Sequence, residues 1–134
     1  MSRRLARELA FKILFQIDMG GNEPEQALQL MLKDANLSLR GESYVREKVW
    51  GCLNNLEYID SIISGFLHRW ELKRLSGVDR NLLRLAVFEM KYSKDIPLAV
   101  SINEAIELAK IYSGEESAKF INGILDNMVK NKSF

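Results

Sequence analysis

Cysteine, histidine and proline are scarce in this sequence, and each shortage excludes a class of protein. Among 134 residues there is one cysteine, Cys52, and one histidine, His68. One cysteine cannot form an internal disulfide, and a zinc site of Cys and His ligands needs about four such residues. The sequence also lacks an apolar run of the roughly 18 residues that a membrane-spanning helix needs. Its N-terminus lacks the apolar stretch that is typical of a secretory signal peptide. We therefore expect no metal site, no membrane span and a cytoplasmic protein.

Only two prolines, Pro24 and Pro97, interrupt the chain, and apolar residues recur mostly at intervals of three and four. This spacing predicts an all-α protein with almost no strand. Capping signals and glycines divide it into about seven helices, at about 3–19, 22–35, 42–54, 56–68, 76–91, 101–112 and 117–130. Because the connections are short, neighbouring helices must pack together. We expect two small helical bundles, about 1–75 and 76–134, fused into one compact domain.

Capping boxes mark where several of these helices should begin. In such a box a polar side chain accepts a hydrogen bond from the backbone N–H three residues later, and an acidic side chain there reaches back. Three pairs fit this description: Asn22 with Glu25, Ser76 with Asp79, and Ser101 with Glu104. The last pair is the clearest and predicts a helix that begins at Ser101.

The net charge is only +1, but its distribution is uneven, because residues 1–12 hold four basic residues and one acidic residue. A helix there gathers one apolar stripe from Leu5, Ala6, Leu9, Ala10, Ile13 and Ile17. The opposite arc holds Arg3, Arg4, Arg7 and Lys12, with Phe11 and Phe15 among them. Basic groups interleaved with aromatic rings suit single-stranded nucleic acid, since the cations neutralise phosphates and the rings stack on unpaired bases. Burial of both rings under another helix, with a solvated basic end, is an equal alternative on periodicity alone.

The helix expected at 76–91 should lie at the centre of the fold, because it is apolar over most of its circumference. Arg80, Arg84 and Lys91 share a narrow polar strip, which suits solvent or an acidic partner. Glu89 falls on the apolar side. Since a buried carboxylate needs partners, we interpret it as a hydrogen-bonded structural group.

The last helix offers a second aromatic and basic pair. Phe120 lies at the edge of its apolar stripe with Lys119 further round. Such a ring either packs in the core or stacks on a base, and the helical pattern does not distinguish these two roles.

Catalytic motifs are absent, including the Gly-rich phosphate loop and the nucleophile elbow. We interpret His68 as a helix-end residue and Cys52 as a small core residue. We therefore expect no enzyme, and an acid or base role for Glu89 or His68 is the least favoured alternative.

Four stretches together resemble the NusB family of bacterial transcription antitermination factors. They are RRLARELAFKILFQ at 3–16, DRNLLRLAVFE at 79–89, SINEAIELAK at 101–110 and KFINGILD at 119–126. They occur in the family's order and spacing over nearly the whole chain. Related domains are also fused to RNA methyltransferases, but the chain ends at Phe134, so we expect a stand-alone factor.

The resemblance implies a function. NusB proteins pair with NusE, a small-subunit ribosomal protein, and the heterodimer binds the single-stranded boxA element of nascent RNA. With other Nus factors it helps RNA polymerase read through terminators, notably in ribosomal RNA operons. No cofactor is implied. The oligomeric state of the free protein, monomer or homodimer, stays open. A ribosome-biogenesis or RNA-chaperone factor that uses the same RNA face is the alternative.

The resemblance also assigns residues. The family's arginine-rich start implies RNA contacts at Arg3, Arg4 and Arg7, and its aromatic position falls on Phe15, where tyrosine is common. Lys119 and Phe120 are implied as further RNA contacts, with Glu116 a weaker candidate. The surface that faces NusE is implied to include Asp79, Arg80 and Arg84.

Overall fold

The structure, a computed structural model, describes residues 2–69 and 71–134. These ranges contain seven α helices and one 3-10 helix, with no strand, so the predicted all-α fold is confirmed. Within the same ranges, no helix is long and apolar enough to cross a membrane. The helices are α1 (Arg3–Gly20), α2 (Pro24–Ala35), α3 (Leu39–Asn54), α4 (Leu56–Ser64), α5 (Gly77–Tyr92), α6 (Leu98–Tyr112) and α7 (Glu115–Lys130), with the 3-10 helix η1 (Leu72–Arg74) before α5.

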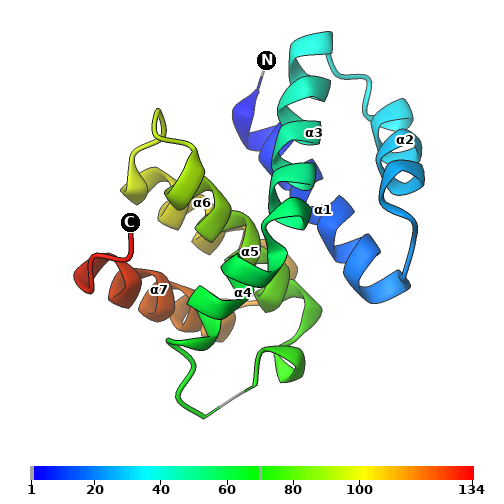
Figure 1. Ribbon diagram of the computed structural model, residues 1–134. Coiled ribbons are helices and arrows are strands. Elements are labelled where there is room, and N and C mark those ends of the chain that lie inside the picture. The colour runs from blue at the N-terminus through cyan, green and yellow to red at the C-terminus, as the bar shows by residue number, and fades with distance from the viewer. Residues whose placement is uncertain (1, 70) are drawn as a thin grey trace.

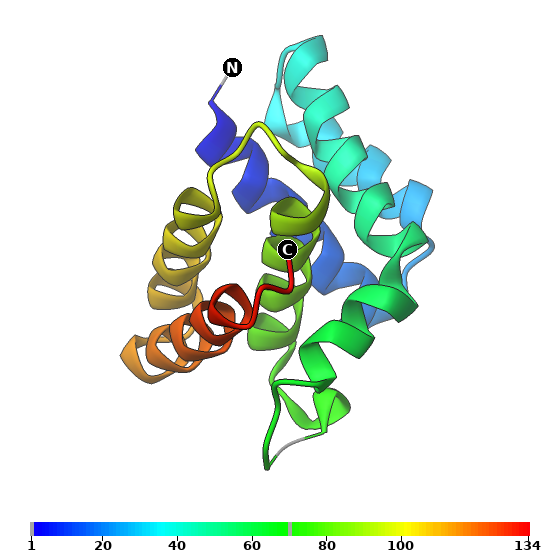
Figure 2. The same cartoon turned by 60° about the vertical axis from the view of Figure 1, so that its left-hand side comes forward.

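Helix α5 is the centre of the molecule, as its apolar circumference predicts. It packs against α1, α3, α4, α6 and α7. Helices α1 to α3 lie together on one side of it, and α6 and α7 lie on the other (Figures 1 and 2). The bundle boundary expected near residue 76 falls at the start of α5, and one hydrophobic core runs across it.

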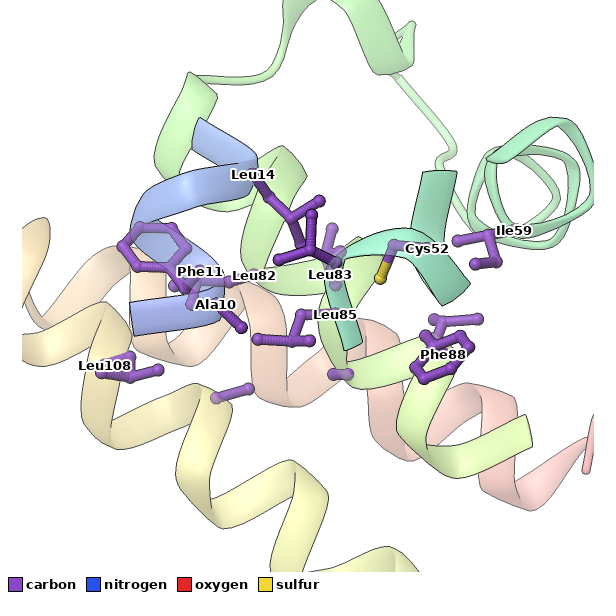
Figure 3. Close-up of a cluster of buried hydrophobic side chains, with 14 of the residues drawn as sticks. Ala10, Phe11, Leu14, Cys52, Ile59, Leu82, Leu83, Leu85, Phe88 and Leu108 are labelled. Atoms are coloured by element: carbon purple, nitrogen blue, oxygen red, sulfur yellow. The ribbon is translucent and has the colours of Figure 1, made fainter. Parts of the chain in front are cut away.

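The core is built from side chains that converge on α5 from the surrounding helices (Figure 3). Cys52 of α3 is fully buried in it, as predicted, and Ile59 of α4 is also fully buried. Burying each large aliphatic or aromatic side chain contributes roughly 1.5–3 kcal/mol, so this convergence dominates the stability. The labelled members are Ala10, Phe11, Leu14, Cys52, Ile59, Leu82, Leu83, Leu85, Phe88 and Leu108.

The buried stripe of α1 is turned relative to the predicted one. Leu5 is 49% exposed, whereas Phe11 and Leu14 are each 2% exposed. The stripe shifts because α1 packs mainly against three helices, α2, α3 and α5, and also meets Glu104 and Tyr112 of α6, so it has no single partner. Phe11 is therefore a core residue, and the aromatic residue left at the surface of this helix is the half-buried Phe15.

The prediction that a capping box begins a helix at Ser101 is wrong. Helix α6 begins one turn earlier, at Leu98, directly after Pro97. The hydroxyl of Ser101 donates to the Glu89 carboxylate at 3.4 Å, and Glu104 accepts hydrogen bonds from arginines of α1. The residue types that cap a helix also serve tertiary contacts, and here the tertiary contacts use them.

Other helix ends differ by smaller amounts. Glu23, and not Asn22, caps α2 by accepting from a backbone N–H, and Ser38 does the same for α3, which begins three residues earlier than expected. Helix α4 ends at Ser64, so His68 lies in the connection beyond the helix and not at its end. The Ser76 cap of α5 is confirmed.

Two helical glycines should respond oppositely to alanine. A Cβ at Gly51 of α3 would lie 2.2 Å from Cζ of Phe88, whereas a Cβ at Gly123 of α7 would have no heavy atom within 4 Å. We expect Gly51→Ala to lower the free energy of unfolding by about 1–3 kcal/mol through overpacking. Gly123→Ala should raise it by about 0.5–1 kcal/mol. Urea denaturation measures both, and a Gly51→Ala protein as stable as the parent would contradict the packing of α3 on α5.

Candidate nucleic-acid interface

Arg3 and Arg4 project from the first turn of α1, which Ser2 caps by accepting a hydrogen bond from the backbone N–H of Leu5. Their side chains are 53% and 74% exposed. Arg3 lies 3.5 Å from Asp95, and Arg4 binds Glu104 at 2.7 Å. The Arg3–Asp95 pair is exposed on both sides and contributes only about 0–1 kcal/mol, so a phosphate can replace Asp95 at small cost. Glu104 is 12% exposed and also accepts a hydrogen bond from Arg7, so it keeps one cation if a phosphate takes Arg4.

Arg7 does not share that surface. Its side chain is 6% exposed and forms two hydrogen bonds to the Glu89 carboxylate, from Nε at 2.7 Å and from Nη2 at 2.8 Å. Its Nη1 donates to Glu104 at 3.2 Å. The prediction that Arg7 is an exposed cation is therefore wrong, because the helix turns this residue toward α5. The prediction that Glu89 is a buried, hydrogen-bonded group is confirmed, since its side chain is 1% exposed.

The charges of this network shift one another's pKa. The hydrogen bond from Arg4 holds the pKa of Glu104 below its ordinary value, against burial, which raises it. The same hydrogen bond raises the pKa of Arg4. Arg4 and Glu104 therefore both stay ionised at neutral pH, and the surface around Arg4 carries charges of both signs.

Phe15 lines a hollow of about 340 Å³, which we call the α1 hollow. The Phe11 ring lies 5.2 Å from the Tyr112 ring and 6.3 Å from that of Phe15. The Lys12 ammonium lies 5.7 Å from the centre of the Tyr112 ring, and the Tyr112 hydroxyl donates to Glu8 at 2.7 Å. The half-buried rings of Phe15 and Tyr112 offer stacking faces to a base, and the exposed Lys12 offers its phosphate a cation, while the buried Phe11 supports both rings from the core. The α1 hollow is lined by Phe11, Lys12, Phe15, Gln16, Met31, Val78 and Tyr112.

Sequence reasoning missed Tyr112 as part of this site. The tyrosine ends α6, far from α1 in the chain, and only the packing of α6 beside α1 brings it to Phe15 and Lys12. Its sequence neighbourhood contains no signal that would have found it.

Lys119 and Phe120 line a second hollow of about 380 Å³, which we call the α7 hollow. Lys119 is exposed and Phe120 is half-buried, so this ring is both a core neighbour and an accessible surface. Glu116 is exposed one turn earlier on α7 and does not line the hollow. The α7 hollow is lined by Phe66, Leu67, His68, Arg69, Lys119, Phe120, Gly123 and Ile124.

Arg80 and Arg84 are not the freely exposed strip that the helix pattern predicts. Their side chains are 10% and 11% exposed. Arg80 donates to Asp18 at 2.8 Å, and Arg84 forms two hydrogen bonds to Asp60 at 2.8 and 2.9 Å. Burial raises the pKa of Asp18, but hydrogen bonds from Asn81 and Arg80 outweigh it, and the net pKa is lowered. These arginines connect α5 to α1 and α4, at the wall of a shallow hollow of about 460 Å³.

The start of α5 also contacts α1 and α7, the two helices that carry the candidate RNA residues. Asp79 is half-buried and accepts a hydrogen bond from the hydroxyl of Ser117, which ties α5 to α7. A Cβ on Gly77 would lie 2.9 Å from the ring of Phe15, so glycine at this position lets the ring lie close against α5.

Groups suited to metal binding or nucleophilic chemistry do not assemble in the part of the chain that the structure describes. No cluster of three or more His, Cys, Asp or Glu side chains occurs there. Burial raises the pKa of the Cys52 thiol, which is fully buried and so an inert core residue.

Comparison with known proteins points to one family. The sequence model of the NusB family matches residues 4–130. The transcription antitermination protein NusB of Pelotomaculum thermopropionicum is 47% identical over 131 residues, which cover 98% of this chain and 91% of that protein. The structure of T. maritima NusB is 45% identical with a TM-score of 0.91, covering 97% of this chain and 92% of that one. A chain in the crystal structure of antitermination factors NusB and NusE in complex with dsRNA is 31% identical with a TM-score of 0.89, covering 96% of each chain.

The different environments of Arg7 and Arg3 predict different effects on stability. Arg7→Ala leaves the Glu89 carboxylate buried without its cation and should lower the free energy of unfolding by about 3–5 kcal/mol. Arg3→Ala removes an exposed, 3.5 Å pair and should change it by less than about 0.5 kcal/mol. Urea denaturation compares the two variants.

A double variant separates charge burial from loss of packing. Arg7→Met with Glu89→Leu removes both members of the buried pair and should be more stable than Arg7→Ala alone, because no carboxylate is left buried at position 89 without its cation. If Arg7→Ala and Arg3→Ala are equally stable, the buried pair does not form in solution.

Proposed function

The chain belongs to the NusB family of transcription antitermination proteins, and we propose that it binds single-stranded boxA RNA as a heterodimer with NusE. The observation that supports this most is the pair of exposed arginines, Arg3 and Arg4, on the helix that also carries the half-buried Phe15. A relative that is 31% identical was crystallised with NusE and dsRNA.

In this proposal Arg3 and Arg4 exchange carboxylates for phosphates. Arg3 is held by Asp95 of the α5–α6 connection and Arg4 by Glu104 of α6, and RNA replaces each anion with a phosphate while Glu104 keeps its hydrogen bond from Arg7. Arg7 acts indirectly, because its pair with Glu89 fixes the face that α1 presents.

The two hollows then take unpaired bases. Aromatic rings stack on any base, and stacking is worth about 1–3 kcal/mol per base. In the α1 hollow Phe15 and Tyr112 supply the rings, and Lys12 supplies a cation. In the α7 hollow Phe120 and Lys119 have these roles, and Glu116, exposed one turn earlier on α7, is a weaker candidate outside the hollow. A paired base inside a duplex presents no free face, which is why we propose a single strand.

For NusE we propose the surface at the start of α5. Arg80 and Arg84 form the wall of a charged hollow there, together with the more exposed Glu71 and Lys73, and Asp79 directly precedes Arg80 on the same helix. Arginines already fixed by Asp18 and Asp60 lose little freedom when a partner binds.

The complex would then act in the bacterial cytoplasm, where nascent RNA emerges from RNA polymerase. It would join other Nus factors there and promote read-through of terminators, notably in ribosomal RNA operons. This role needs binding and no chemistry on the RNA, so we propose no enzymatic activity. A ribosome-biogenesis or RNA-chaperone role would use the same RNA face without polymerase.

The RNA face predicts a change in salt dependence. Each phosphate neutralised on a single strand contributes about 0.7 to the slope of log affinity against log salt. We expect Arg3→Ala with Arg4→Ala to reduce the slope by about 1.4, and Lys33→Ala with Lys130→Ala, at exposed lysines of α2 and the last turn of α7, to leave it unchanged. Fluorescence anisotropy with a boxA-like oligonucleotide measures the slope.

The aromatic residues should behave differently. Phe15→Leu keeps an apolar side chain against α5 but removes the ring, so the affinity should fall with little change in slope. If this variant binds RNA with normal affinity but has a lower melting temperature, Phe15 is only a packing residue, and the α1 hollow does not bind a base.

The heterodimer makes its own prediction. Lys73 is 81% exposed, so Lys73→Glu should leave the melting temperature unchanged while weakening NusE binding in titration calorimetry. Addition of NusE should tighten binding to single-stranded boxA RNA more than to a duplex of the same sequence, and should raise terminator read-through by purified polymerase. RNA binding with no effect on read-through would favour the chaperone alternative.

A further inference from the structure

The α7 hollow has an unusual distribution of charge. Arg69 and Lys119 supply two exposed cations to its lining, the exposed His68 lies next to Arg69 in the chain, and none of the eight lining residues is acidic. Over the whole chain acidic and basic residues are nearly equal in number, 18 against 19. The α7 hollow is therefore a local concentration of positive charge in a protein that is nearly neutral.

Arg69 and Lys119 also lack the carboxylate partners that several arginines of this protein have. Arg4, Arg80 and Arg84 each lie within 3.5 Å of a carboxylate. Among the described residues, no carboxylate lies within ion-pair distance of Arg69 or Lys119. Their charges are thus oriented toward a shared hollow without an anion from this chain, which is the arrangement expected of a site for an external anion.

The floor of the α7 hollow is apolar, and it is open at Gly123. Phe66 and Phe120 are half-buried, Ile124 is 8% exposed, and a Cβ on Gly123 would meet no heavy atom within 4 Å. A planar ring can therefore lie against the backbone of α7 at Gly123. Cations around an apolar floor match a nucleotide, whose phosphate is anionic and whose base has two apolar faces.

We propose that Arg69 and His68 extend the RNA-binding surface from α7 onto the connection that follows α4. Arg69 and Lys119 contact phosphates on either side of one nucleotide, its unpaired base stacks on Phe120 above Gly123, and His68 donates a hydrogen bond to that base or its ribose. The inference rests on the proposed function and adds a segment that none of the four sequence stretches includes. Residues 66–69 precede α7 by about 50 positions, and only the fold joins them.

The test compares two arginines of the same connection. Arg69 lines the α7 hollow, whereas Arg74, exposed in η1, does not. Arg69→Ala should reduce the salt slope for single-stranded RNA by about 0.7, and Arg69→Ala with Lys119→Ala by about 1.4. Arg74→Ala should change neither slope nor affinity. His68→Ala should lower affinity with the slope unchanged at pH 8.

A variant with a blocked floor tests the stacking without removing charge. Gly123→Leu places a good helix former at an exposed position, so the fold should persist, as circular dichroism can verify. Because the leucine side chain occupies the place of the base, the affinity should fall at least fivefold while the salt slope stays unchanged. Normal RNA binding by both Arg69→Ala and Gly123→Leu would overturn the inference.

Failure of this inference is distinguishable from failure of the proposed function. If the unmodified protein binds no single-stranded RNA, with or without NusE, the proposed function fails. If it binds, and the Arg3 and Arg4 double variant loses affinity while Arg69→Ala does not, only the extension onto 66–69 is wrong. Weaker NusE binding by Arg69→Ala with unchanged RNA binding would show that the α7 hollow is a protein surface, which also overturns the inference.

Discussion

The rest of the structure depends on the buried ion pair between Arg7 of α1 and Glu89 of α5. Its two hydrogen bonds are 2.7 and 2.8 Å long, and Glu104 of α6 adds a third contact to the same guanidinium. Removing such charges from water costs several kcal/mol per ion, and only close, fully hydrogen-bonded geometry offsets this. A rotation of α1 that broke the pair would leave two charges unpaired in the core. The pair therefore fixes the orientation of the first helix on the central one.

The exposed features of α1 follow from that orientation. Once Arg7 points inward, Arg3 and Arg4 lie on the solvent side and Phe11 enters the core, while Phe15 remains half-buried at its edge. Glu104 links the two regions, because it accepts hydrogen bonds from both Arg4 and Arg7. A single carboxylate thus belongs both to the structural network and to the proposed RNA face.

Several features were predictable because their cause is local. The near-continuous apolar surface of 76–91 indicates a central helix whatever packs around it, and Ser76 caps that helix through the backbone N–H of Asp79, only three residues away. Other local signals were misleading because the same residue types have two uses. Ser101 and Glu104 have the spacing of a capping box, but both side chains instead contact charged groups of other helices.

The sequence by itself determined the all-α fold, the central position of α5, the burial of Glu89 and Cys52, and the family, because periodicity, capping and motif order are properties of neighbouring residues. Only the tertiary structure decided that Arg7 is buried, and that Tyr112 joins Phe15 in one hollow. It alone placed Arg69 beside Lys119. A helical wheel shows which residues share a face, but not how many neighbours that face meets. Burial and contacts between distant residues depend on those neighbours, and the packing of whole helices sets them.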